Sequence, residues 1–158
     1  MRTLALPLAL AMLTACAEPA PPAAAPDLDA LRDTVLQLEG QLNAEAMALN
    51  CSMPELGDGD PLFVSQGNVA RTRAEFVDTC AQMVAPRTAG EYDAERITAH
   101  VLSPDAAIVV REGNLTINFR ERESWTGRVV VTSVWHRGDE GWKAVHLHES
   151  SPQTSDMD

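Results

Sequence analysis

Basic residues, aromatic residues and cysteine are scarce in this chain of 158 residues. Its 12 lysines and arginines face 23 aspartates and glutamates, which gives a net charge of −11. Such a surface repels phosphate backbones and anionic headgroups, so we expect no nucleic-acid binding and no charge-driven contact with a membrane. The chain also lacks a nucleophile motif, a phosphate-binding loop and a cofactor fingerprint, so we predict no cofactor, and the sequence names no reaction.

The N-terminal apolar run, Leu4 to Leu13, is too short to span a bilayer and follows the positive charge of Arg2. This pattern predicts a signal peptide over residues 1–15. The run ends in Leu13-Thr14-Ala15-Cys16, which resembles the lipobox of bacterial lipoproteins, in which the cysteine is acylated and becomes the mature N-terminus. An ordinary secretory signal with a chance cysteine is the alternative.

The residues after Cys16 extend this interpretation. Ala17 stands where the inner-membrane retention signal of lipoproteins would have aspartate, so the resemblance implies a protein anchored by its lipid to the outer membrane, on the periplasmic side. Residues 16–26, the lipidated cysteine and a Pro/Ala-rich stretch, are typical of a tether. The length of the rest allows one domain, over residues 27–151, before a disordered tail over residues 152–158.

The cysteine count agrees with an oxidising compartment. If Cys16 carries the lipid, Cys51 and Cys80 remain as an even pair, and only one intramolecular disulfide is possible. Two buried free thiols are the alternative.

Helical periodicity dominates the first half of the domain. An apolar stripe at steps of three and four predicts a helix from Asp27 to about Asn50, capped by Asp27 or Asp29, with Glu39 on its solvated face. A second helix is predicted over residues 71–84. Its expected buried residues are Phe76, Val77, Cys80, Met83 and Val84.

After Gly90 the period of the apolar residues becomes two, which predicts strands. We expect them at residues 92–102, 106–112, 115–120, 124–137 and 142–150, with turns at 103–105, 112–114 and 138–141. Short links between neighbouring strands favour an antiparallel sheet. Helices followed by such a sheet define the α+β class.

Three segments carry a resemblance to a known family. The stretches "FVSQGNVARTRAEF", "AAIVVREGNLTINF" and "VWHRGDEGWKAVHLHES" resemble the SnoaL-like branch of the nuclear transport factor 2-like superfamily, over residues 27–151. The resemblance implies a cone, in which N-terminal helices pack on a strongly curved antiparallel sheet and leave a pocket at its wide mouth. The superfamily contains isomerases, cyclases, dehydratases and non-catalytic binding modules, so the fold does not settle the function.

The last of these segments holds three of the four histidines. A turn at residues 138–141 pairs Arg137 with Trp142, and strand alternation from that pair divides the hairpin into two faces. One face holds Ser133, Trp135, Trp142, His146 and His148, and the other holds Val130, Val134, His136, Val145 and Leu147. A three-histidine metal site therefore fails on geometry, and we predict no metal.

In the resembling fold the first of these faces is concave and lines the pocket. The predicted pocket residues are Ser133, Trp135, Trp142, His146 and His148, joined by Tyr92 and His100. In the resembling superfamily an aliphatic convex face commonly becomes a dimer interface, so the resemblance implies a homodimer. The alternative is that the histidines are core groups, hydrogen-bonded to a helix.

Three functions stay open. The first is a lipid-anchored periplasmic module that binds a small apolar or amphipathic ligand without catalysis. The second is a lyase or isomerase of the polyketide cyclase or ketosteroid isomerase type, in which a pocket histidine acts with Asp93, Glu95 or Glu149. The third is a structural interaction module of the cell envelope. No active site is visible in the sequence, which favours the non-catalytic interpretation.

Overall fold

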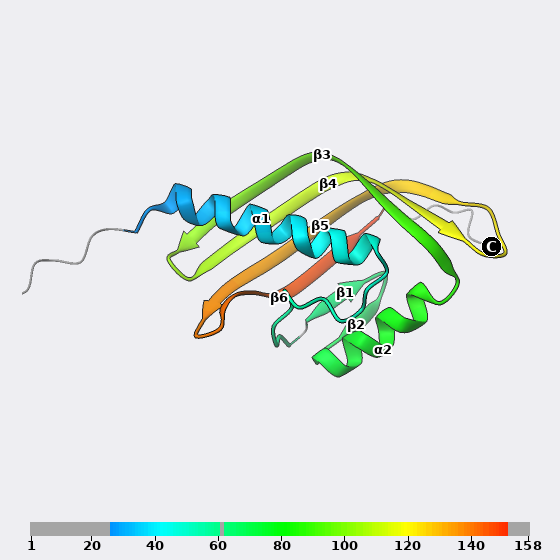
Figure 1. The fold of residues 1–158 in the computed structure, drawn as a ribbon, viewed down its shortest axis with the longest axis horizontal. Coiled ribbons are helices and arrows are strands. Elements are labelled where there is room, and N and C mark those ends of the chain that lie inside the picture. Colours follow the sequence, from blue (N-terminus) through cyan, green and yellow to red (C-terminus); the bar gives the residue numbers. More distant parts are fainter. Residues whose placement is uncertain (1–25, 61, 152–158) are drawn as a thin grey trace, which may run out of the picture.

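The computed structural model describes residues 26–60 and 62–151. The predicted signal peptide, the predicted lipidation site Cys16, nearly all of the predicted tether and the predicted tail lie outside these residues. One long helix, α1, crosses one face of a curved sheet, and a shorter helix, α2, lies beyond the C-terminal end of α1 (Figure 1). No helix in the described ranges is both long enough and apolar enough to cross a membrane.

Helix α1 spans Leu28–Met47. Its N-cap is Asp27, whose carboxylate accepts hydrogen bonds from the backbone N–H groups of residues 29 and 30, so the cap is the first of the two predicted candidates. The predicted apolar stripe is only partly correct. Leu28 at its start is exposed, whereas Glu39, predicted on the solvated face, is among the most deeply buried residues of the helix.

Helix α2 spans Arg73–Val84 and begins at the N-cap Thr72. Phe76 and Cys80 are buried as predicted, but Val77 is 38% exposed. The ring of Phe76 packs edge-to-face on that of Phe63, at 5.6 Å between the ring centroids. This contact anchors α2 to β1.

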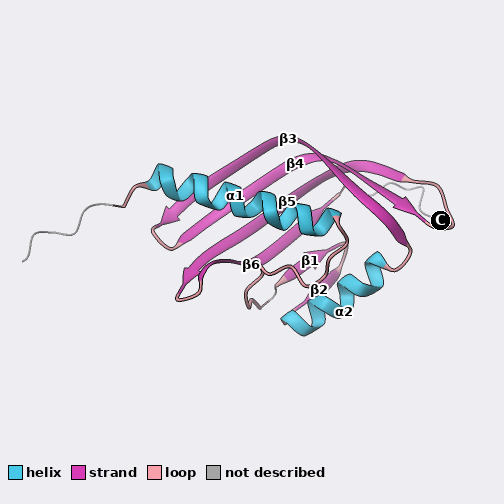
Figure 2. Ribbon diagram, viewed as in Figure 1, coloured by secondary structure: helices cyan, strands magenta, loops and turns pink. Residues whose placement is uncertain are grey.

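The sheet has six strands, in the order β2-β1-β6-β5-β4-β3 (Figure 2). Their bounds are β1 Phe63–Ser65, β2 Asn68–Ala70, β3 Arg87–Ser103, β4 Ala106–Phe119, β5 Trp125–Gly138 and β6 Gly141–Ser150. Among the strands of the described residues, four of the five pairings are antiparallel, and β1 pairs with β6 in parallel. Helices packed on this curved sheet confirm the α+β class.

The predicted turn at residues 112–114 is wrong, because β4 runs through it without a break. Gly113 is buried inside the strand, and a Cβ there would lie 2.2 Å from the carbonyl oxygen of Asp93 on β3. The glycine therefore permits a close approach of two strands instead of a reversal of the chain. The reversal occurs later, at residues 120–124.

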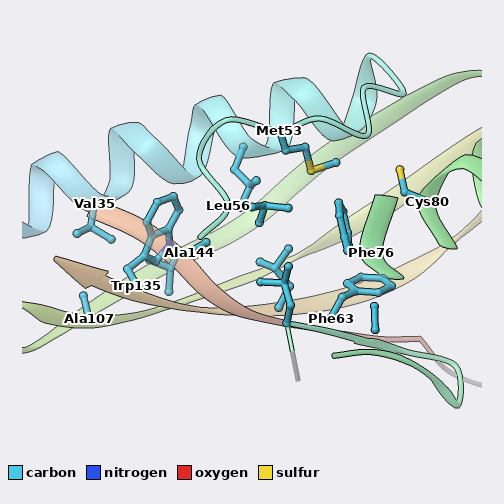
Figure 3. Packing of buried hydrophobic residues seen from close by; sticks show 14 of the residues in the cluster. Val35, Met53, Leu56, Phe63, Phe76, Cys80, Ala107, Trp135 and Ala144 are labelled. Atoms are coloured by element: carbon cyan, nitrogen blue, oxygen red, sulfur yellow. The ribbon is translucent and has the colours of Figure 1, made fainter. Parts of the chain in front are cut away.

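The main core lies between α1, α2 and the face of the sheet that they cover. Figure 3 shows Trp135 beneath α1, beside Val35, with Phe63 and Phe76 further along toward α2. A second, smaller cluster forms on β4 and β5. It consists of Leu115, Ile117 and Val129, with Met47, Tyr92, Phe119, Trp125 and Val131 packed against it.

The predicted disulfide is confirmed. Cys51, in the loop after α1, is bonded to Cys80 on the buried side of α2, and 29 positions separate the two cysteines in the sequence. The bond joins the loop after α1 to α2. It is the only covalent connection between them apart from the chain itself, among the residues that the structure describes.

We predict that the variant Cys51→Ser/Cys80→Ser is folded but less stable by about 2–4 kcal/mol, because the open chain regains loop-closure entropy when it unfolds. Urea denaturation of the wild type with and without reductant, and of the double variant, measures this difference. Equal midpoints for the oxidised and reduced wild type would contradict it.

Candidate functional site

The β5–β6 hairpin follows the predicted register only at its tip. The pairs Gly138↔Gly141 and Trp135↔Ala144 are as predicted, but a β-bulge follows, and Val134 pairs with His146. Val145 is the extra residue. Beyond it every side chain of β6 lies on the face opposite to the predicted one, so the placement of His146 and His148 beside Trp135 is wrong.

The bulge lies where the segment before β1 crosses the edge of β6. The amide of Gly57 donates to the carbonyl of Ala144 at 2.9 Å, and the amide of Leu147 donates to the carbonyl of Leu62 at 2.7 Å, one bond on each side of the bulge. The shift buries Leu147 to 7% exposure and leaves His148 exposed. Burial of an aliphatic side chain is favourable, whereas an imidazole in its place would need a hydrogen-bond partner.

All four histidines consequently lie on the convex face, away from α1. Strand pairing places His100, Ile108, Val134 and His146 in one row across β3, β4, β5 and β6. His136 shares this face, contrary to the prediction that separated it from His146. Even so, no group of three or more His, Cys, Asp or Glu side chains in residues 26–60 and 62–151 is arranged to hold a metal ion.

Ser133 and Trp135 lie on the concave face as predicted, but α1 seals both. The indole Nε1 of Trp135 donates to Glu39 Oε2 at 2.8 Å, and the hydroxyl of Ser133 donates to the same oxygen. Arg111 Nε donates to the other carboxylate oxygen at 2.5 Å. Trp142 is half-buried against the main core. This part of the concave face is a packed core and leaves no place for a ligand.

A cavity of about 110 Å³ lies further along α1, where the helix, α2 and the sheet meet. We call it the inner cavity. Most of its lining is apolar and comes from both helices, the loop after α1, and strands β1 and β3 to β6: Leu42, Ala46, Met47, Leu49, Met53, Phe63, Phe76, Cys80, Met83, Val84, Gly90, Leu115, Ile117, Val129, Val131 and Leu147. Of the predicted pocket residues, only Tyr92 lines it.

Tyr92 is the most informative polar residue of the inner cavity. Its hydroxyl is buried without a hydrogen-bond partner. The guanidinium of Arg111 packs against the ring, 5.1 Å from its centroid. Burial raises the pKa of Tyr92 above 10, against smaller lowering effects of Arg111 and Arg128. The hydroxyl is therefore protonated at neutral pH and presents an unused donor.

Arg87 and Glu149 add charge where the inner cavity meets a second hollow of about 540 Å³. We call this hollow the outer groove; it is bounded by Gln82, Phe119, Arg122 and Trp125, and it shares Arg87 and Glu149 with the cavity. Glu149 accepts a hydrogen bond from the Ser65 hydroxyl at 3.0 Å. Arg87 Nε is buried without a partner, and burial lowers the pKa of Arg87 although Glu149 opposes the shift.

Sequence reasoning missed Glu39, Arg87 and Arg111, and it considered Glu149 only as a partner of a pocket histidine. A signal existed for two of them. Glu39 stands four residues after Val35 and three before Leu42, inside the apolar stripe, and Arg111 alternates inward with Val109. Opposite charges at core positions of two elements indicate a buried pair. Glu149 gave no such signal, because its face depends on the bulge.

We predict that Glu39→Leu and Arg111→Met each cost about 3–5 kcal/mol of stability, since each leaves the other charge buried without its partner. The double variant should recover about 1–3 kcal/mol relative to the sum of the two losses. Urea denaturation of the four proteins completes the cycle. Additive losses would show that the two side chains are not coupled.

Comparison with known proteins agrees with this architecture. The family model described as "SnoaL-like domain" matches residues 42–154, and the chain therefore belongs to the SnoaL-like domain family. No curated protein matches the sequence significantly.

The solved structures that resemble this chain share its fold at low sequence identity. A nuclear transport factor 2-like superfamily protein from Salmonella enterica serovar Typhimurium superposes with a TM-score of 0.72 at 14% identity, over 83% of this chain and 97% of that one. A hexachlorocyclohexane dehydrochlorinase from Novosphingobium barchaimii gives 0.67 at 16% identity, over 79% and 88%. An NTF2-like protein of unknown function from Pseudomonas putida gives 0.64 at 15% identity, over 81% and 91%. These likenesses establish the nuclear transport factor 2-like fold.

Proposed function

We propose that this protein is a lipid-anchored module of the bacterial envelope that binds a small amphipathic molecule in the inner cavity without transforming it. The observation that carries the proposal is the buried, unpartnered hydroxyl of Tyr92 inside a largely apolar cavity. A buried donor without a partner is costly, and a ligand atom that accepts its hydrogen bond removes that cost. Ligand sites commonly combine an apolar lining with a few such polar groups.

The size of the cavity restricts the ligand. An engineered cavity of roughly 150 Å³ accommodates benzene, so the inner cavity of about 110 Å³ holds only a small molecule or one end of a longer one. The outer groove continues from it past Phe119 and Trp125. An elongated ligand with one polar acceptor at Tyr92 and an apolar body along the groove fits both hollows.

Catalysis is the second candidate function. Acid–base catalysis by a pocket histidine is excluded, because all four histidines lie on the convex face of the sheet, away from the inner cavity. Glu149 favours a different version, since this carboxylate lines the same cavity as the Tyr92 donor. A carboxylate base with a hydroxyl donor is suited to proton abstraction next to a carbonyl. The hexachlorocyclohexane dehydrochlorinase of the same fold catalyses an elimination, and it supports catalysis in this cavity only by analogy.

Proton exchange separates the two candidates. In D₂O the α-hydrogens of 2-decanone exchange for deuterium at a rate set by the buffer. A protein that only binds the ketone leaves this rate unchanged, whereas an enzyme accelerates the exchange. Proton NMR measures the rate. Loss of that acceleration in Glu149→Gln would establish catalysis and overturn the non-catalytic proposal.

Self-association through the convex face remains part of the proposal. Ile108, Val110, Val130 and Val134 form a half-buried aliphatic patch on that face. Leu147, predicted there as well, is instead buried in the core. Partial exposure of several neighbouring aliphatic side chains is typical of a surface that pairs with a second copy.

We predict that Cys16 carries the lipid. The wild type should partition into the detergent phase of a Triton X-114 extraction of its host's envelope, and mass spectrometry should find an acylated N-terminal Cys16. Cys16→Ser should be soluble or unprocessed. A Cys16→Ser protein cleaved at the same bond and still membrane-bound would disprove the anchor.

We predict that the neutral fluorophore N-phenyl-1-naphthylamine binds the inner cavity and outer groove, and that 2-decanone displaces it. Tyr92→Phe should weaken 2-decanone by about 1 kcal/mol, roughly fivefold, because the donor to the carbonyl is lost. Affinity for the fluorophore itself, which has no comparable acceptor, should be nearly unchanged. Fluorescence titration gives both constants.

A matched pair of variants tests whether the ligand occupies the inner cavity. Ala46 lines the inner cavity, whereas Ala44 is exposed on the same helix. Ala46→Phe should fill the cavity and abolish displacement by 2-decanone, and Ala44→Phe should behave as the wild type. Equal binding by both variants would place the ligand elsewhere.

A further inference from the structure

We infer that the ligand carries a single negative charge and that Arg87 is the residue that binds it. This inference rests on the proposed function, because it assigns a chemical class to the molecule in the same two hollows. The class is a monoanionic amphiphile, of which a medium-chain carboxylate is the simplest example.

The position of Arg87 is the first support. It is the first residue of β3, pairs with Phe119 on β4, and lines both the inner cavity and the outer groove. A charged group at this junction lies between the apolar lining of the cavity and the aromatic wall of Phe119 and Trp125. The head of an amphiphile at this junction faces the inner cavity, which Tyr92 also lines, and its chain follows the outer groove past Phe119 and Trp125.

The unsatisfied state of Arg87 is the second support. Its Nε is buried without a hydrogen-bond partner, and no carboxylate of the described residues lies within salt-bridge distance of its guanidinium. Arg111, the other arginine of the inner cavity, is neutralised by Glu39. A planar guanidinium matches the two oxygens of a carboxylate, so an anion is the partner that this group lacks.

Glu149 limits the charge of that anion to one. It attracts Arg87 from a distance and shares both hollows with it, while Arg122 repels Arg87 from the groove side. The Ser65 hydroxyl holds one oxygen of Glu149. Arg87, Arg122 and Glu149 together carry a net charge of +1 around the outer groove, so a monoanion balances them and a dianion leaves the site with excess negative charge.

Displacement of N-phenyl-1-naphthylamine at pH 7.5 tests the inference with three probes of equal chain length: decanoate, 1-decanol and decyl phosphate. In the wild type, decanoate should bind at least about fivefold more tightly than either of the others. Arg87→Gln should weaken decanoate by roughly tenfold or more, because a charge-assisted pair is lost. The affinity of this variant for 1-decanol should stay within about twofold of the wild-type value, and this retained binding also shows that the variant is folded.

Two further variants make the test specific. Arg120→Gln removes an exposed positive charge from the turn after β4 and should leave all three affinities unchanged. Glu149→Gln removes the repelling carboxylate and should tighten decanoate by about threefold or more. A purely structural Arg87, which only balances Glu149, predicts no such gain.

The outcomes distinguish the inference from the proposed function. If 1-decanol and decanoate bind equally and Arg87→Gln changes neither affinity, the assignment of Arg87 as an anion site is wrong. The inner cavity is then still a binding site, as the proposed function states. If decyl phosphate binds most tightly, the single-charge assignment is overturned. If neither the fluorophore nor any probe binds, the proposed function itself fails.

Discussion

A buried carboxylate on α1 determines how this domain is built. Glu39 is 1% exposed and lies between Arg111 of β4 and the Ser133 hydroxyl and Trp135 indole of β5. Burial of such a charge is tolerated only when all of its partners are in place. This requirement fixes both the rotation of α1 about its own axis and its distance from the sheet. The disulfide between Cys51 and Cys80 then fixes α2 relative to the end of that helix.

This constraint divides the concave face into two parts. Around Glu39 the helix closes directly on the sheet, and Trp135 is fully buried there. Beyond it, α1 and α2 cover the sheet through methionine and leucine side chains, and the inner cavity remains. Arg111 belongs to both parts, since it binds Glu39 and packs on the ring of Tyr92. The ion pair that seals one half therefore also positions the donor of the other half.

Much of the fold was predictable because it depends on local pattern. The cap at Asp27, the helical period over most of α1 and the turn at residues 138–141 follow from short-range chemistry, whereas the disulfide followed from the cysteine count. The bulge at Val145 does not, because the edge contacts of Gly57 and Leu62 accompany it and both are distant in sequence. One extra residue moved His146 and His148 out of the predicted site and brought Glu149 into the cavity. Of the predicted pocket residues, only Tyr92 lines the inner cavity.

Tyr92 is the single tyrosine of the chain, so tyrosine labelled with ¹³C at Cζ gives one NMR signal that reports directly on its hydroxyl. If the hydroxyl is a buried donor that awaits a ligand, its signal should titrate with a midpoint above pH 10, in line with its raised pKa, and should shift in a saturable manner when 2-decanone is added at neutral pH. A signal that titrates near pH 10 and does not respond to 2-decanone would show that Tyr92 faces water, and the cavity would lose its role as a binding site.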